Sequence, residues 1–194
     1  MSTVEFFYSF RSPYSYLAAP RIFALPSDFR VRLRFRGVRP MVTRGQPVPP
    51  AKRLYILRDA GREARRLGLP FGPVHDPLGE AVWRCLRLCE LAAGQDRIAA
   101  FVLAAGHAIW AEGADLARER PMRKVCEQAG LAWPDCLRAF DDPKGLEAME
   151  RNTEQLGELG LWGVPSFWFA EHRFWGQDRI VDLVCCLEEA GLRI

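Results

Sequence analysis

The sequence has 194 residues, of which 49% are hydrophobic and 26% are charged, and its formal net charge is +3. This length suits one domain or one domain with a large insertion, and the composition is ordinary for a soluble globular protein. No apolar run approaches the roughly 20 residues of a membrane span, no signal-peptide pattern opens the chain, and the small net charge does not indicate nucleic-acid binding. We therefore expect a cytoplasmic protein that binds neither membrane nor nucleic acid.

The first expected elements are a strand and a helix joined by a short polar segment. Residues 4–8 (VEFFY) form a β-type run rich in aromatic residues, and residues 14–23 are compatible with a helix. Ser12 before Pro13 is typical of a helix start, with a hydroxyl cap and then proline at the first helical position. Such a helix N-terminus presents backbone N–H groups and a positive dipole end to a ligand, although an ordinary capped helix explains the same residues.

A second strand is expected at residues 31–36 (VRLRFR), where apolar and polar residues alternate. A right-handed crossover would make it parallel to the first strand. The alternating arginines favour a solvated edge over a phosphate-binding track, and a basic patch for an anionic ligand stays an alternative; they are Arg30, Arg32, Arg34 and Arg36. Residues 37–50 are interrupted by prolines, which predicts a loop without regular structure.

The pattern from residue 51 to residue 160 is helical. A helix is expected from 52 to about 67, stopped by Gly68 and Pro70, and further helices at roughly 80–93, 95–112, 121–130, 134–140 and 143–160. Two short strands follow, at residues 166–169 and 174–175, before a final apolar helix. The expected order is therefore β-α-β, a helical insertion domain at 51–160, and β-β-α, with residues 1–50 and 161–194 forming one domain.

Motifs at opposite ends of the chain resemble those of one family. Residues 12–18 (SPYSYLA), 163–167 (GVPSF) and 174–179 (FWGQDR) are similar, in sequence and in order, to motifs of 2-hydroxychromene-2-carboxylate isomerases and kappa-class glutathione transferases. Both groups belong to the DsbA branch of thioredoxin-like proteins. The resemblance covers the whole chain and implies an α/β thioredoxin-like fold with a large all-helical insertion. It also implies glutathione as cofactor, a small aromatic substrate, aromatic catabolism and a homodimer.

The resemblance assigns roles to particular residues. Ser12 would donate a hydrogen bond to the glutathione thiolate, so that the cofactor rather than the serine supplies the nucleophile. Val164 and Pro165 would present backbone groups to the extended tripeptide, with a cis proline or, alternatively, a trans proline at a strand start. Further cofactor contacts are implied for Lys52, Tyr55, Trp175, Gly176, Gln177 and Asp178. Asp178 is in addition a candidate N-cap of the last helix.

The substrate side of the site is less defined by the sequence. Arg11 or Lys52 could hold a substrate carboxylate, and Tyr14 is among the aromatic residues that could flank a planar ring. A solvated lysine and ordinary core packing explain the same residues equally well.

The six cysteines do not indicate redox or metal chemistry. None form a C-x-x-C pair, and Ser12 stands where a redox relative would carry its nucleophilic thiol. Because serine cannot exchange disulfides, a disulfide oxidoreductase is disfavoured. No other ligand lies at zinc spacing, so we expect buried reduced thiols and no metal.

We therefore hypothesise a glutathione-dependent isomerase that converts compounds of the 2-hydroxychromene-2-carboxylate type to the trans-o-hydroxybenzylidenepyruvate type. Two alternatives stay open. One is a kappa-type transferase that consumes glutathione by conjugation, and the other is a thiol-binding thioredoxin-like protein without turnover. The isomerase and the transferase share their glutathione-facing residues, so substrate profiling has to separate these two. The third would bind glutathione or nothing, and Ser12→Ala would leave any assay unchanged.

Overall fold

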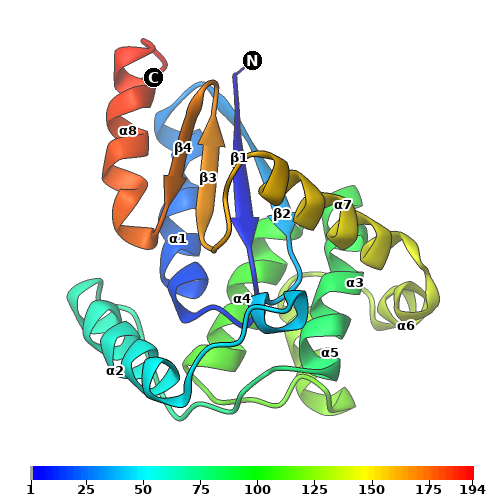
Figure 1. Ribbon diagram of the computed structural model, residues 1–194. Coiled ribbons are helices and arrows are strands. Elements are labelled where there is room, and N and C mark those ends of the chain that lie inside the picture. The colour runs from blue at the N-terminus through cyan, green and yellow to red at the C-terminus, as the bar shows by residue number, and fades with distance from the viewer. Residues whose placement is uncertain (1) are drawn as a thin grey trace.

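A four-stranded mixed sheet lies at the centre of the computed structural model, which describes residues 2–194 (Figure 1). β1 (Ser2–Tyr8) pairs in parallel with β2 (Val31–Gly37) and antiparallel with β3 (Ser166–Phe169). β3 then pairs antiparallel with the edge strand β4 (His172–Trp175), giving the order β2-β1-β3-β4. All four predicted strands and the parallel pairing of the first two are confirmed.

The first helix begins as the sequence predicts and ends later. α1 (Pro13–Asp28) is capped by Ser12, whose Oγ accepts a hydrogen bond from the Ser15 N–H at 3.1 Å. The sequence predicts that this helix ends at residue 23, but it continues to Asp28 and contains both Pro20 and Pro26. Each proline removes one N–H donor, but burial of the apolar face, including Ile22 and Leu25, stabilises the helix beyond them.

Six helices lie between β2 and β3, and one follows β4. They are α2 (Pro50–Arg66), α3 (Glu80–Gly94), α4 (Ile98–Trp110), α5 (Glu119–Gln128), α6 (Trp133–Asp141), α7 (Lys144–Glu158) and α8 (Ile180–Glu189). Gly68 has the predicted role at the end of α2, with a left-handed φ of +65°. Within residues 2–194, none of these helices combines the length and apolar character that crossing a bilayer requires.

The segment before α2 corrects one prediction. Residues 37–50 do contain regular structure, because Met41–Arg44 form a 3-10 turn, η1. The Thr43 hydroxyl donates to the Pro40 carbonyl at 2.7 Å, and Gly45 ends the turn with a φ of +72°. Proline therefore fixes the start of this short helix rather than preventing it.

One hydrophobic core joins the sheet to the inserted helices. The inner face of β1, including Phe6 and Tyr8, packs against α1 and α8, and the same cluster of buried residues continues into α3, α4 and α5. Figure 1 shows α1 behind the sheet and α3 to α6 below it. Phe10 makes the junction: its ring lies 6.1 Å from that of Phe101, and its carbonyl accepts the Trp110 indole N–H at 3.2 Å.

The opposite face of the sheet is partly covered by α7. Phe7 packs there against Leu156 and Leu161. Arg36 is half-buried on this face and forms an ion pair with the buried Glu5, so the prediction of a fully solvated arginine edge is wrong for this residue. Arg32 and Arg34 are exposed, as expected for an edge strand.

Candidate functional site

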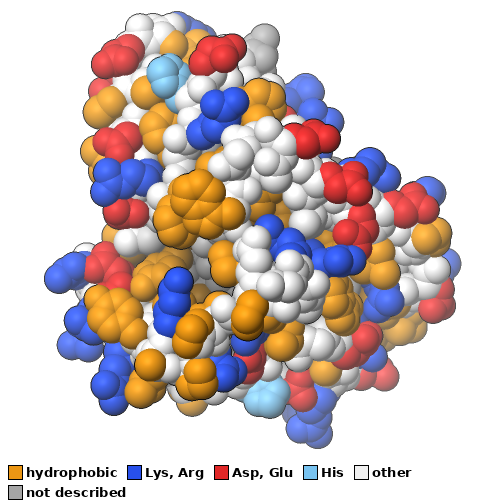
Figure 2. All heavy atoms as spheres, viewed as in Figure 1, with side chains coloured by type: hydrophobic (Ala, Val, Ile, Leu, Met, Phe, Trp, Pro, Cys, Tyr) orange, Lys and Arg blue, Asp and Glu red, His pale blue; other side chains and the backbone are white. Residues whose placement is uncertain are grey.

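A cavity of about 440 Å³ lies where the sheet meets the inserted helices. Its walls come from residues 9–14 after β1, the η1 region, the N-terminal half of α2 and the loop between α2 and α3. Trp110 at the end of α4, the Gly163–Val164 segment and Trp175 at the end of β4 complete the lining. Figure 2 shows apolar side chains gathered over this side of the molecule, with lysine and arginine side chains between them. The volume is in the range of small-molecule and cofactor sites.

Ser12 lies at the join between these segments. Its hydroxyl caps α1 and at the same time donates to the Val164 carbonyl at 3.2 Å, 152 residues away in sequence. The Ser12 N–H donates to the Ser9 carbonyl at 2.9 Å, which fixes the loop before the helix. The Ser12 side chain is thus held at the positive end of a helix dipole, where it faces the cavity.

The Val164–Pro165 peptide bond is cis, as predicted. Val164 lines the cavity, and Gly163 beside it packs directly under the ring of Trp175. A Cβ atom at residue 163 would lie 2.8 Å from Trp175 Cε2, so only glycine allows this approach. Trp175 also packs against Trp162, with 5.1 Å between ring centroids, and about half of each side chain is exposed.

Three cationic side chains line the cavity: Arg11, Lys52 and Arg53. Arg11 is neutralised by Asp76, with Nε–Oδ1 and Nη2–Oδ2 distances of 2.8 and 2.6 Å. Burial alone would raise the pKa of Asp76, but hydrogen bonds from Arg11 and from the Leu78 N–H outweigh it, so the pKa lies below its usual value. Across residues 2–194, no carboxylate lies within 4.0 Å of Lys52 or Arg53. The cavity therefore carries net positive charge.

Tyr14 connects α1 to α2. Its hydroxyl donates to Asp59 Oδ2 at 2.7 Å. Burial, followed by this hydrogen bond and the charge of Asp59, raises the pKa of Tyr14 well above its usual value, so Tyr14 is protonated throughout the physiological range. Tyr55 also lines the cavity but is 59% exposed, and the Arg62 guanidinium lies 5.7 Å from its ring centroid.

The structure brings together most, but not all, of the predicted site residues. Arg11, Ser12, Tyr14, Lys52, Tyr55, Val164 and Trp175 line the cavity. Pro165 and Gly176 lie just outside this lining, where the Gly176 N–H donates to the Pro165 carbonyl at 2.9 Å.

Gln177 and Asp178 are also outside the lining. Gln177 is buried between α1 and α2, where it accepts hydrogen bonds from Arg21 and donates to Glu63 at 3.2 Å. The prediction that Asp178 caps the last helix is wrong, because a 3-10 turn at Gln177–Arg179 precedes α8. Asp178 instead forms an ion pair with Arg179 at 2.7 Å.

Sequence reasoning missed several residues of the cavity. Ser9 lines it with a buried hydroxyl that has no hydrogen-bond partner within residues 2–194. Arg53 follows the predicted Lys52 on the same helix, and this adjacency could have indicated that Arg53 also lines the cavity. Asp76 comes from an irregular loop 65 residues from Arg11, where no periodicity could have indicated it.

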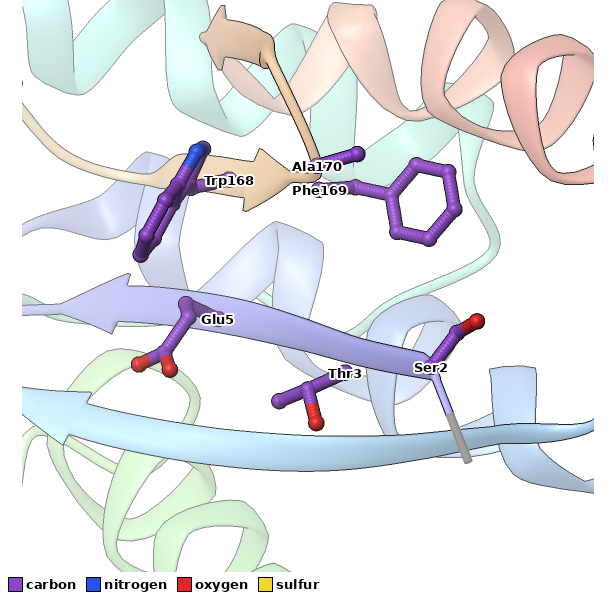
Figure 3. Close-up of a pocket in the computed structure, with 6 residues that line it drawn as sticks. All are labelled: Ser2, Thr3, Glu5, Trp168, Phe169 and Ala170. Carbon is purple, nitrogen blue, oxygen red and sulfur yellow. The ribbon is translucent and has the colours of Figure 1, made fainter.

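A second cavity, of about 360 Å³, lies on the α7 side of the sheet, away from Ser12 (Figure 3). It is lined by Ser2, Thr3, Glu5, Trp168, Phe169 and Ala170. Among these six residues Glu5 carries the ionisable side chain, and it is already paired with Arg36 and, at 3.8 Å, with Arg34. Within the described lining, this cavity therefore offers no unpaired charged side chain and is a poor candidate for the site.

The fold and a serine-capped helix facing a cis-proline loop define a thioredoxin-like protein. The family of DSBA-like thioredoxin domains matches residues 3–187, and the chain belongs to this family. All six cysteines are free, and Cys85, Cys89, Cys126 and Cys136 are buried.

Two curated relatives of this chain are both named 2-hydroxychromene-2-carboxylate isomerase. The chain is 27% identical to a 2-hydroxychromene-2-carboxylate isomerase of Sphingobium xenophagum over 92% of this chain and 94% of the relative. It is 24% identical to the isomerase of the same name from Pseudomonas putida, over 91% and 90%. A solved structure of 2-hydroxychromene-2-carboxylate isomerase has the same fold, with a TM-score of 0.82 and 24% identity over 97% and 95% of the two chains. The cytosolic disulfide reductase DsbM from Pseudomonas aeruginosa, solved with GSH, has a TM-score of 0.68 at 21% identity over 89% and 88%.

Proposed function

We propose that this protein is a glutathione-dependent isomerase of a small aromatic carboxylate, of the 2-hydroxychromene-2-carboxylate type. The observation that carries the proposal is the position of Ser12, whose hydroxyl faces a cavity at the N-terminus of α1 beside the Val164 carbonyl. The names of the curated relatives support the same reaction.

The residues present fit glutathione. The cavity combines a hydroxyl donor at a helix N-terminus, an accepting backbone carbonyl at Val164 and the free cation Lys52. These groups match a thiolate, a peptide backbone and a carboxylate. Glutathione, when bound, supplies a thiolate that adds reversibly to a conjugated double bond and so permits rotation about it.

Ser12 can change hydrogen-bond partner when a peptide binds. Its hydroxyl donates to the Val164 carbonyl over 3.2 Å, which is long for an O–H donor. If Val164 accepts an N–H from an extended peptide, as in strand addition, the Ser12 hydroxyl is released to donate to sulfur. Ser12 then stabilises the thiolate while its lone pair still caps the Ser15 N–H. The contacts of Tyr55, Trp175, Gln177 and Asp178 with the cofactor belong to the same proposal.

Titration of glutathione into wild type and Ser12→Ala tests the proposal, with heat and thiolate absorbance followed against pH. We expect wild type to bind glutathione and lower its thiol pKa, and Ser12→Ala to lose about 100-fold or more in kcat for 2-hydroxychromene-2-carboxylate, as when one oxyanion-stabilising donor is removed. Ser15→Ala is the matched control, because the Ser15 hydroxyl is buried on the same helix without a partner within residues 2–194.

The fate of glutathione distinguishes the reactions. Isomerisation leaves the total glutathione unchanged, whereas a transferase consumes one molecule for each molecule of product. Binding without turnover of any substrate would indicate a non-catalytic thiol-binding protein. Absence of glutathione binding in wild type would refute the assignment of the site.

A further inference from the structure

We infer that Asp76 is a built-in substitute for a substrate carboxylate, bound to Arg11 until an anionic aromatic substrate displaces it. The inference rests on the proposed function for the identity of the substrate. It adds a specificity-determining pair to the site: Arg11 as the carboxylate receptor and Asp76 as its internal competitor.

The geometry of the pair is that of a bound carboxylate. Arg11 donates through Nε and Nη2 to the two oxygens of Asp76, at 2.8 and 2.6 Å. A guanidinium fork recognises any planar carboxylate in this two-point arrangement. Because Arg11 directly precedes Ser12, a carboxylate in this place would be held next to the group proposed to orient the thiolate.

The two partners differ in their freedom to move. The Arg11 side chain is only 16% exposed, whereas that of Asp76 is 51% exposed. Asp76 lies in a loop whose ends are fixed: the Gly72 N–H donates to the Trp110 carbonyl at 2.9 Å, and the Val82 N–H donates to the Pro77 carbonyl at 3.2 Å. Residues 73–76 between these anchors are exposed. Movement of the Asp76 carboxylate into solvent therefore requires no change in the core.

A second cation is available to Asp76 once it leaves Arg11. Arg53 lines the same cavity, and its charge contributes to lowering the pKa of Asp76, so it lies within electrostatic range. No carboxylate of residues 2–194 lies within 4.0 Å of Arg53. If Asp76 moves from Arg11 to Arg53 while an incoming anion binds Arg11, both arginines are paired with a carboxylate, so an anionic ligand makes that exchange favourable. A neutral ligand gains nothing from it.

The experiment measures binding rather than turnover. Trans-2-hydroxycinnamate and its primary amide are titrated calorimetrically into wild type, Asp76→Asn and Arg11→Met. Asparagine retains the oxygen that accepts the Leu78 N–H at 3.1 Å, so the loop keeps its local turn. Removing the competitor should tighten binding of the carboxylate about tenfold, because the fraction of molecules with a free receptor rises. Arg11→Met should weaken it about tenfold or more. Binding of the amide should not change in Asp76→Asn.

Glu80→Gln is the matched control for the loss of one negative charge. Glu80 lies close by in sequence at the start of α3 but pairs with Arg84 and Arg87 rather than with Arg11. We expect it to leave both affinities unchanged. Asp76→Ala, which also removes the competing carboxylate, repeats the test should the asparagine variant fail to fold.

Three outcomes would overturn the inference: weaker carboxylate binding in Asp76→Asn, equal tightening for the carboxylate and the amide, or no carboxylate binding in either wild type or variant. The first would show that Asp76 positions Arg11 for binding. These results are independent of the proposed reaction, because a protein that binds no glutathione can still show the Asp76 effect, and an active isomerase can lack it.

Discussion

The two walls of the cavity are built in different ways. The wall on the sheet side consists of Ser12, Gly163 and Val164, and backbone atoms, a helix cap and close packing hold it. The wall on the helical side consists of the N-terminal half of α2 and the 70–79 loop. It presents long, exposed side chains such as Lys52 and Arg53, with no carboxylate partner within residues 2–194. The groups of the sheet-side wall are therefore held in one geometry, whereas the side chains of the helical wall can change conformation to fit a ligand.

This difference separates two tasks. A reacting thiolate needs a donor at a fixed position, since small displacements of catalytic groups are costly. Recognition of an anionic substrate tolerates movement, because charge acts over longer distances than a hydrogen bond. The following predictions test this division, beginning with the wall that should be least tolerant.

Gly163→Ala should have the largest effect. The new methyl group would lie 2.8 Å from Trp175 Cε2, which forces the indole ring or the Gly163–Val164 backbone to move. We expect a loss of about 100-fold in kcat/KM, the cost of misplacing groups around the reacting atoms. Steady-state kinetics would measure it, with Gly157→Ala as control because a Cβ there meets no atom within 4 Å. Near-normal activity of Gly163→Ala would show that this wall adapts as well.

Tyr14→Phe should have a smaller effect, mainly on stability. It removes the 2.7 Å hydrogen bond to Asp59 that joins the two walls through α1 and α2. We expect the free energy of unfolding to fall by about 1.5–3 kcal/mol, the usual range for a hydrogen bond to a charged group. Urea denaturation would measure it. Tyr55→Phe, at a 59% exposed position, should not change the free energy measurably; an equal loss in both variants would argue against a specific role of Tyr14.

The stability difference between wild type and Tyr14→Phe should depend on pH. The folded state raises the pKa of Tyr14, first through burial and then through Asp59, so folding favours the protonated phenol. Its contribution is fully present below about pH 10, the usual pKa of unfolded tyrosine, and is lost as the pH rises further toward the folded-state pKa. Unfolding experiments on both proteins should show a constant difference up to about pH 9 and a narrowing one above pH 10. A difference that widens at high pH would contradict the assignment.

Lys52→Met should have the smallest effect. Because Lys52 is exposed, we expect glutathione binding to weaken only about 2–5-fold, in line with exposed ion pairs. The salt dependence of binding should decrease at the same time. Lys144→Met is the control, because it removes the same charge at the start of α7, where Lys144 pairs with Asp142 of the preceding connection. If glutathione binding weakens by much more than fivefold, Lys52 would have to be counted with the fixed groups of the sheet-side wall.

The fixed wall was largely predictable from the sequence. Ser12-Pro13 is a local cap signal, so two consecutive residues are enough to place the hydroxyl at a helix start. Gly163-Val164-Pro165 is likewise a local motif. The four strands follow from short apolar runs, and only the second of them, β2, was predicted from alternating apolar and polar residues.

The adaptable wall was less predictable, because its contacts are distant in sequence and come from irregular segments. Asp76 lies in the irregular connection after α2, 65 residues from Arg11 in sequence. The Tyr14–Asp59 bond joins two helices whose relative orientation no periodicity gives. At Asp178, by contrast, a local signal was present and the prediction made from it was wrong. A local cap signal was present, but one further turn of 3-10 helix moved the start of α8 to Ile180.

The continuous core described above also has a consequence for how this chain can be re-engineered. Tyr8 ends β1 and Phe10 lies in the turn after it, yet both belong to the core shared with α4, where Gly106 lies close to the Tyr8 hydroxyl and the Tyr16 ring. Removal of residues 51–160 would leave these aromatic rings in water. The inserted helices therefore cannot be exchanged between relatives unless the residues of the remaining chain that pack against them are changed as well. We expect thermal unfolding to be a single cooperative transition. In a chimera of two relatives, the two sequences should be joined within surface loops, and α1 and α4 should come from the same parent.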